Sequence, residues 1–325
     1  MEFFKAKQPY NFMGWVKPVF TFSLLVSILS IYLIMTKGFV FGIDFAGGTV
    51  VQVQYDKPVR IDEIRAHLAK TPFAGVGIQE FGSADEIVLR FQNTSAEITK
   101  DTAKQVSEAL SGTGNFEVRR VDMVGPKVGK ELQTQGTVAL LVSVIGILIY
   151  VAFRFEWRFA VAAIIALVHD VLITAGMVSL FNVEFDLTVL AALLTILGFS
   201  INDTIVIFDR IRETIRDTKE SGKYHLANLI NESVTNTLSR TILTVATVFF
   251  VVLTLFLYGG EIIHGFSFAM LIGVIFGAYS SIFVASPFLM WFGYDIAKAK
   301  AIQAEKVRRA AEKERLRSQF EQGVV

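Results

Sequence analysis

Long apolar stretches alternate with polar segments along the chain, and this pattern is the first guide to its fold. Six stretches are almost free of charge and approach or exceed about 20 residues, the length that a helix needs to cross roughly 30 Å of hydrocarbon. The first stretch is not followed by a small-residue cleavage site, so we expect it to remain as an uncleaved anchor. The pattern predicts membrane-spanning helices at residues 18–36, 136–153, 159–181, 187–208, 240–258 and 264–292.

Lysine and arginine are unevenly distributed among the connecting segments. If residues 1–17 are cytoplasmic, then the segments on the same side, 209–239 and the basic tail 293–325 among them, carry many Lys and Arg residues. The short loops on the opposite side carry none. This asymmetry follows the positive-inside rule, which long translocated domains escape. We therefore expect cytoplasmic termini and an extracytoplasmic domain at 37–135.

That outer segment alternates between strand and helix periodicity. The order of the predicted elements is β-α-β-β-α-β, which is the ferredoxin-like arrangement. The segment shows no Ser/His/Asp set and no metal-spaced cluster. It is therefore either a rigid sandwich or a docking module that accepts an extended chain at an exposed sheet edge. Strands are expected at 49–55, 75–81, 86–91 and 116–121, and helices at 61–70 and 95–110.

The composition agrees with a polytopic α-helical membrane protein. The chain is 53% hydrophobic and only 19% charged, whereas soluble domains carry roughly 25% charged residues. A net charge of +1 argues against nucleic acid as a partner. The absence of cysteine excludes disulfides, thiolate metal sites and cysteine nucleophiles. The glycine-rich segment 125–130 is too short for a phosphate loop. We expect no enzyme activity, cofactor or metal, and an ion gradient as the energy source.

Two aspartates lie within predicted spans, where an ionisable residue costs roughly 2.5–3.5 kcal/mol and is a functional candidate. Desolvation favours the neutral form of a carboxyl group, so Asp170 and Asp203 are candidates to bind and release a proton. An arginine that approaches the carboxylate would favour its charged form, and Arg240 is the third member of this candidate proton relay. Alternatively, the aspartates only join helices through hydrogen bonds. The polar residues expected to support the site are Asn202, His169, Ser200 and Arg210.

Small residues recur at every fourth position of the last predicted span. Such a stripe lets another helix approach closely. The pattern does not say whether that helix belongs to this chain or to a partner. The helix-packing residues are Gly265, Ala269, Gly273, Gly277, Ser281 and Ala285.

A glycine-rich segment follows the first span, where the outer domain begins. Gly42, Gly47 and Gly48 surround Asp44, and glycine relaxes the limits on backbone angles. The segment is either a tight turn into the first strand or a hinge about which the outer domain rotates. Farther along the chain, Glu184 and Asp186 are expected to be solvated loop residues.

Several motifs resemble the SecD/SecF family of protein-export membrane proteins, in family order and over nearly the whole chain. They are FGIDFAGGT at 41–49, VGPKVGKEL at 124–132, HDV at 169–171, SINDTIVIFDRIRE at 200–213 and the stretch 260–287. The resemblance implies a six-span subunit of the bacterial inner membrane that pairs with SecD into a unit similar to the RND superfamily of proton-driven transporters.

The same resemblance implies a function. Members of the family are thought to use the proton-motive force to assist preproteins across the membrane, after SecA has used ATP at the SecYEG channel. YajC and YidC are further possible partners. The resemblance assigns the proton-carrying position to Asp203, and Asp170 and Arg240 match other charged residues of the family. Two alternatives remain: a passive scaffold for SecD, and half of a small-molecule RND-type exporter.

Overall fold

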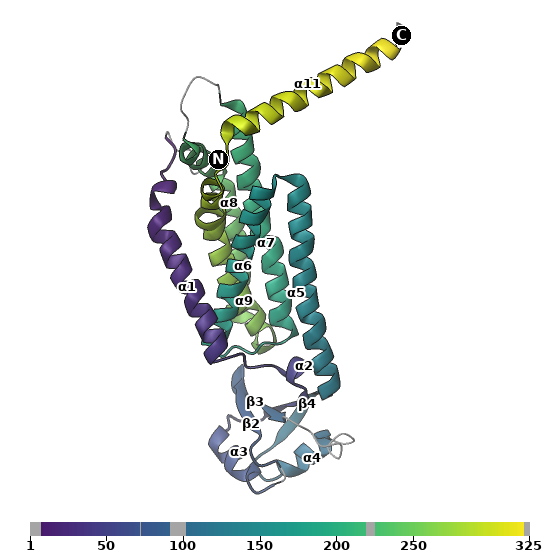
Figure 1. Cartoon of the computed structure of the whole chain (residues 1–325). Helices are drawn as coiled ribbons and strands as arrows, with labels where there is room; N and C mark the ends of the chain where they lie inside the picture. The colour runs from purple at the N-terminus through teal and green to yellow at the C-terminus, as the bar shows by residue number, and fades with distance from the viewer. Residues whose placement is uncertain (1–7, 72, 92–101, 219–224, 322–325) are drawn as a thin grey trace.

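The computed structural model describes residues 8–71, 73–91, 102–218 and 225–321. A bundle of long helices carries a small α+β domain at one end and a projecting helix, α11 (Ile296–Glu321), at the other (Figure 1). Among the described residues, six helices are long and apolar enough to cross a membrane, which confirms the predicted fold class. They span Met13–Thr36, Pro126–Arg154, Trp157–Leu180, Leu187–Asp217, Leu226–Tyr258 and Glu261–Trp291.

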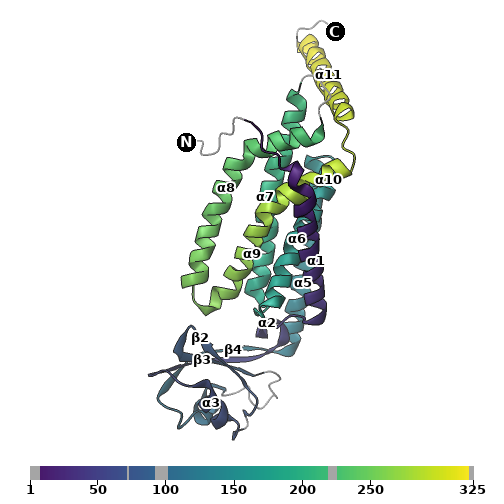
Figure 2. The same cartoon turned by 90° about the vertical axis from the view of Figure 1, so that its left-hand side faces the viewer.

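The helices divide into an inner and an outer set. Helices α6 (Trp157–Leu180), α7 (Leu187–Asp217) and α9 (His264–Ser280) are mostly buried. Helices α1 (Val16–Thr36), α5 (Pro126–Arg154) and α8 (Leu226–Tyr258) expose most of their surface. Figure 2 shows α8 on one flank of the bundle and α1 on the other. The exposed side chains are largely apolar, as expected for helices that face lipid or a partner subunit.

Three helices extend well beyond the predicted bounds. Helix α5 begins at Pro126 instead of 136, with Gly125 in an extended conformation before it and proline at its first position. Helix α7 continues to Asp217. Helix α8 begins at Leu226, so Arg240 lies inside a continuous helix and does not open it. The first turns of α8 are rich in Asn, Ser and Thr, which is why hydropathy alone does not find them.

The last span is interrupted. A short 3₁₀ turn, η3 (Glu261–Ile263), leads into α9, and a π-helical turn, η4 (Ser281–Ala285), separates α9 from α10 (Ser286–Trp291). The Ser286 hydroxyl donates to the Ser281 carbonyl at 2.9 Å, across this turn. Turns of this kind are rare and often lie at functional sites.

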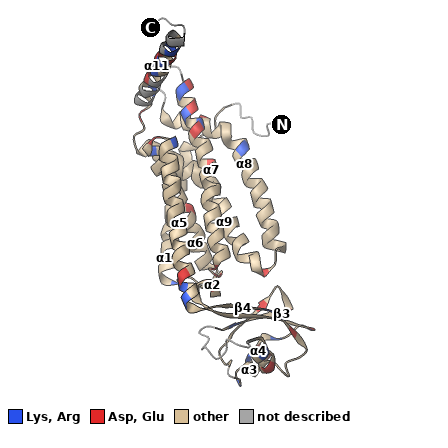
Figure 3. Cartoon of the chain, turned by 90° about the vertical axis from the view of Figure 1, so that its right-hand side faces the viewer, with Lys and Arg blue, Asp and Glu red and all other residues tan. Residues whose placement is uncertain are grey.

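The three tryptophans of the chain lie at one end of the bundle. Trp15 precedes α1, Trp157 begins α6 and Trp291 ends α10, all at the end of the bundle away from the outer domain. Each of the three tryptophans is more than half exposed. Tryptophan prefers the interface between hydrocarbon and water. We therefore expect the ends of α7 and α8 that extend past this level to lie outside the hydrocarbon. Figure 3 shows charged residues gathered there.

The outer domain has the predicted element order. Its four-stranded antiparallel sheet has the order β2-β3-β1-β4, with Val51 opposite both Leu89 and Val121. Helices α3 and α4 lie on the face of the sheet that points away from the bundle (Figure 1). Part of the helix expected at 95–110 lies outside the described residues. The elements are β1 (Gly48–Tyr55), α3 (Ile61–Leu68), β2 (Gly77–Phe81), β3 (Ser83–Phe91), α4 (Thr102–Ala109) and β4 (Phe116–Val124).

Candidate functional site

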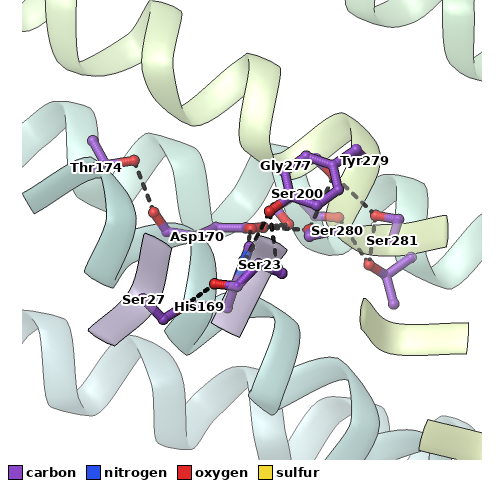
Figure 4. A network of polar contacts seen from close by, with 11 residues as sticks. Ser23, Ser27, His169, Asp170, Thr174, Ser200, Gly277, Tyr279, Ser280 and Ser281 are labelled. Atoms are coloured by element: carbon purple, nitrogen blue, oxygen red, sulfur yellow. Dashed lines mark hydrogen bonds and ion pairs between the residues drawn. The ribbon is translucent and has the colours of Figure 1, made fainter. Parts of the chain in front are cut away.

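Buried polar side chains form a network inside the bundle, and Asp170 on α6 lies at its centre (Figure 4). Its Oδ2 atom accepts hydrogen bonds from Ser200 on α7 at 2.6 Å and from Ser280 on α9 at 2.8 Å. Its Oδ1 atom lies 2.9 Å from Nδ1 of His169. No part of Asp170 is exposed. Both oxygens therefore have partners, and the side chain joins α6, α7 and α9.

The imidazole of His169 extends the network to α1. Its Nε2 atom is hydrogen-bonded to the Ser23 hydroxyl and lies 3.1 Å from the Tyr279 hydroxyl. Ser23 and Tyr279 also share a hydrogen bond of 2.9 Å. Sequence analysis did not select Ser23, Tyr279 or Ser280. Their one signal is a hydroxyl group in an otherwise apolar span.

Asp203 on α7 is the second buried aspartate, only 3% exposed. Its Oδ2 atom has no hydrogen-bond partner among the described residues. Arg240 on α8 is the charged residue that acts on it electrostatically. The next residue, Thr204, shares a hydrogen bond of 2.9 Å with Ser281 at the start of the π-helical turn. Asp203 thus carries a buried oxygen that is free to bind a proton or a water molecule.

The other residues expected to support the site lie elsewhere. Asn202 is exposed on the surface of α7. Arg210 binds Glu213 at 2.6 Å and is not paired with Asp203. Arg240 is exposed on the surface of α8. Among the described residues, no group of three or more His, Asp or Glu side chains is placed to hold a metal ion.

The small-residue stripe of the last span packs inside the chain, against α7. A Cβ atom at Gly265 would lie 3.1 Å from a methyl group of Val189, and one at Gly277 would lie 3.3 Å from Cβ of Ser200. A Cβ atom at Gly273 would overlap the side chain of Ile196. Ala269 and Ala285 are fully buried. The stripe therefore brings α9 close to α7 at the level of the polar network.

A second stripe of small and polar residues, which sequence analysis did not detect, lies on the exposed face of α7. Its members are exposed although their neighbours on the helix are buried. No atom would lie within 4 Å of a Cβ at Gly198. We refer to this surface as the outward stripe of α7; it comprises Ala191, Thr195, Gly198 and Asn202.

The glycine-rich segment joins the outer domain to the bundle. Gly47 and Gly48 have φ angles of +74° and +135°, which strongly favour glycine. The short helix α2 (Ile43–Ala46) precedes them. The Gly42 amide donates to the Phe185 carbonyl at 3.0 Å. The Asp44 carboxylate accepts from the Leu187 amide, at the first residue of α7, at 3.1 Å.

The expectation that Glu184 and Asp186 are merely solvated is wrong, because their loop packs beneath the outer domain. Glu184 forms an ion pair with Arg90 of β3, and both side chains are largely buried. Burial lowers the pKa of the Arg90 guanidinium, an effect that the nearby Asp186 carboxylate opposes. Asp186 caps α7 by accepting from the Val189 amide at 2.8 Å.

Comparison with known proteins places this arrangement in a family. The family model described as "Protein export membrane protein SecD/SecF, C-terminal" matches residues 104–295, and that of the "SecD/SecF GG Motif" matches residues 32–59. Protein translocase subunit SecF of Helicobacter pylori is 44% identical over 100% of both chains. SecF of Vibrio alginolyticus is 43% identical over 94% of this chain and 96% of the relative. SecF of Escherichia coli O157:H7 is 41% identical over 89% of each.

Solved structures show the same likeness. A crystal structure of SecDF, a translocon-associated membrane protein from a Thermus species, superposes with a TM-score of 0.80 at 35% identity. The match covers 91% of this chain and 40% of that one. SecDF in a "Super-membrane-facing form" gives a TM-score of 0.65 at 34% identity, over 94% and 40% of the two chains. The chain thus spans 40% of the length of the SecDF chains. From these matches, the chain belongs to the SecF family of protein translocase subunits.

Proposed function

We propose that this chain pairs with SecD and uses the proton-motive force to help preproteins complete their passage across the membrane. ATP-driven transport by SecA through SecYEG would come first. The observation that carries the proposal is the carboxylate of Asp203, buried within a membrane span with one oxygen unpartnered. A buried carboxylate of this kind destabilises a membrane span. A purely structural subunit would gain nothing from keeping it. The chain also carries no phosphate-loop motif that could hydrolyse ATP.

In the proposed cycle, Asp203 gains and loses a proton while Arg240 controls which form is favoured. With the guanidinium close, the carboxylate is stabilised as an anion. When α8 carries the guanidinium away, the buried carboxyl group takes up a proton. Arg240 is suited to this role because its side chain stands on the exposed face of α8, where movement does not require the inner helices to repack.

SecD is the proposed cover for the exposed polar surface of α7 and α8. Asn202 and Arg240 would be costly in contact with lipid tails, since polar groups within membrane spans normally face other helices or water. The outward stripe of α7 offers small side chains that allow close approach of a partner helix. We therefore expect the chain to be inactive without SecD. YajC and YidC are proposed as further members of the complex.

The proposed location is the bacterial cytoplasmic membrane, with both termini in the cytoplasm. The three tryptophans lie at the end of the bundle that carries the basic segments around Arg154, Arg210 and the α11 tail. Basic residues concentrate on the cytoplasmic side. This orientation leaves the outer domain on the side where a preprotein emerges.

The deciding experiment compares Asp203→Asn with the matched control Asp209→Asn, both co-expressed with SecD. Asp209 lies on the same helix but pairs with Arg154 at 3.0 Å, where the charges are accessible to water. Translocation into vesicles is measured at fixed ATP, with and without a proton gradient. We expect Asp203→Asn to abolish the stimulation by the gradient, and Asp209→Asn to keep it. A passive scaffold would tolerate both changes, because each preserves size and assembly.

The exporter alternative is separated by a second measurement on the same strains. The outer domain is a single small sheet with two described helices, which offers little enclosed volume for a small molecule, although a partner could supply one. If the chain were half of an exporter, Asp203→Asn would raise the intracellular accumulation of dyes and leave preprotein export unchanged.

A further inference from the structure

We infer that Asp170 is a positioning residue: it fixes the rotation of α7, and with it the direction in which Asp203 points, and it carries no proton itself. This inference rests on the proposed role of Asp203. Asp203 would carry the proton, and Asp170 would hold α7 in the orientation that this requires. The geometry of their hydrogen bonds supports this division.

Asp170 and Asp203 differ in the number of their hydrogen-bond partners. Asp170 is fully buried, and both of its oxygens have partners: the hydroxyls of Ser200 and Ser280 donate to Oδ2, and the His169 ring lies at hydrogen-bond distance from Oδ1. These contacts hold the Asp170 side chain to α7 and α9. Asp203 has an oxygen for which no such contact exists among the described residues.

Two hydrogen bonds set the orientation of α7. Ser200 and Thr204 are four residues apart and therefore lie on the same face of the helix. Ser200 is held by Asp170 at 2.6 Å and Thr204 by Ser281 at 2.9 Å. Two attachments one turn apart oppose rotation of α7 about its axis. At about 100° per residue, Asp203 lies roughly 60° from Ser200 and roughly 100° from Thr204 around the helix. The attachments consequently fix the direction in which Asp203 points.

The π-helical turn begins where α9 contacts both α6 and α7. Ser280 and Ser281 are consecutive residues where α9 gives way to this turn. Ser280 binds Asp170 on α6, and Ser281 binds Thr204 on α7. The change of helical geometry therefore coincides with the point where α9 reaches both neighbours. Gly277, one turn earlier, leaves room for this approach, since a Cβ there would lie 3.3 Å from Cβ of Ser200, which is a tight contact.

Other polar groups surround Asp170 and belong to the same unit. His169 is on α6, Tyr279 is on α9, and α1 contributes the uncharged Ser23. The nearest group contributed by α7 is the Ser200 hydroxyl. Any shared titration of this unit would involve His169 or Tyr279, and the variants below leave both side chains in place.

The test is an infrared pH titration of the purified complex with SecD, which follows the carboxyl stretching band of a protonated buried acid. The unaltered complex is compared with Asp203→Asn, Asp170→Asn and Ser200→Ala. We expect the titrating band to vanish in Asp203→Asn. In Asp170→Asn and Ser200→Ala it should keep its amplitude but shift its pH midpoint. Gradient-stimulated export should fall about tenfold or more in Asp170→Asn, since small misplacements of a reacting group have effects of this order.

Each result has a defined meaning. Loss of the band in Asp170→Asn would make Asp170 a proton carrier and overturn the inference. An unshifted midpoint in both Asp170→Asn and Ser200→Ala would also overturn it, because a merely structural role lowers the melting temperature and leaves the midpoint alone. If Asp170→Asn does not fold, Ser200→Ala and Ser280→Ala decide by the same midpoint criterion. A band and export that both persist in Asp203→Asn would instead refute the proposed function.

Discussion

Two buried threonines on α8 differ in whether their hydroxyl groups are satisfied. Thr237 is 8% exposed and donates to the Ser233 carbonyl of its own helix at 3.1 Å. Thr241, one turn later and 4% exposed, has a hydroxyl without a partner among the described residues. It follows Arg240 directly and lies on a helix that packs against α7 and α9. If Asp203 carries the proton as proposed, we expect this hydroxyl to bind a water molecule on the proton path.

Replacing each threonine by valine tests this interpretation, because valine keeps the shape and removes the hydroxyl. We expect Thr241→Val to lower gradient-stimulated export several-fold without lowering the melting temperature, since no hydrogen bond within the protein is lost. Thr237→Val is the matched control and should export normally. Both variants are assayed in vesicles with SecD. Equal export by the two variants would remove Thr241 from the proton path.

Tyr294 allows a prediction of pH dependence outside the membrane spans. It is buried against the ring of Phe159, and its hydroxyl donates to Glu156 at 3.4 Å. Burial, with the Glu156 carboxylate acting in the same direction, raises the pKa of Tyr294 to about 12. An unfolded tyrosine titrates near pH 10. The contribution of neutral Tyr294 to the free energy of unfolding is therefore complete below about pH 10, and it is lost as the pH rises through about 12.

The corresponding variant is Tyr294→Phe. Its melting temperature in detergent should fall less steeply than that of the unaltered protein between about pH 10 and 12, because the buried phenol no longer has to ionise. Tyr10→Phe, at an exposed position, should leave the alkaline decline unchanged. A decline in Tyr294→Phe as steep as in the unaltered protein would contradict the assignment to Tyr294.

The candidate site shows what sequence can and cannot establish about single residues. Asp170 and Asp203 stand out because a charge in an apolar span is conspicuous. The sequence does not show how the surroundings of the two aspartates differ, because the partners of Asp170 come from distant parts of the chain. Ser200 is 30 residues away and Ser280 is 110. For the same reason, the sequence does not show that Asn202 faces outward. The pair Arg210–Glu213 is different, because its i, i+3 spacing on one helix is readable from the sequence.

At the scale of elements, hydropathy finds the helices but not their ends. The apolar parts of all six spans are readable because each must cover the hydrocarbon by itself. The first turns of α8 and the last turns of α7 are polar, and they are helical because they pack on each other, with Ser233 donating to Thr214 at 3.0 Å. The π-helical turn is not readable either, because its hydroxyl contacts depend on α6 and α7.

The two stripes of small residues give a prediction that separates folding from assembly. Gly273 on α9 lies against Ile196 within the chain, whereas Gly198 on α7 faces open space. Gly273→Leu should destabilise the subunit by about 1–3 kcal/mol or more through overpacking. Gly198→Leu should leave the subunit stable and reduce association with SecD, because the outward stripe of α7 can no longer be approached closely.

The measurements are the melting temperature of the isolated chain and its co-purification with SecD. Each variant serves as the control for the other. If Gly198→Leu co-purifies normally, the outward stripe faces lipid, and the SecD interface must be sought on another surface. If Gly273→Leu melts normally, α9 can move away from α7 without loss, and the close packing there is not required.

At the scale of the whole molecule, the fold of each part is readable, but the junction between them is not. The element order of the outer domain follows from local periodicity, and antiparallel neighbours follow from that order. The contacts that tie the domain to the bundle involve Arg90 with Glu184 and Asp44 with Leu187, pairs that are far apart in sequence. Without these contacts, the glycine-rich segment alone suggests more freedom than the junction has.

These contacts also connect the outer domain to the helix that carries Asp203. Asp44 binds the first amide of α7, and Glu184 lies just before that helix. A displacement of α7 on protonation would therefore pull directly on the outer domain. The hinge expected at Gly47 and Gly48 lies between these attachments, so the ion pair must open if the domain rotates there. Proline cannot adopt the φ angles of these glycines, so the ion pair is the better place to test the coupling.

We expect Arg90→Gln and Glu184→Gln each to lower gradient-stimulated export several-fold while expression and SecD pairing remain normal. Each change leaves one largely buried charge without its partner and loosens the attachment of the domain. The exchange Arg90→Glu with Glu184→Arg should restore much of the export, since the pair is re-formed with its charges reversed. Arg120→Gln, which breaks an exposed pair with Asp122 on β4, should have little effect. Normal export by both single variants would show that the Arg90–Glu184 ion pair does not transmit movement of α7 to the outer domain. If it did, removing the pair would lower export.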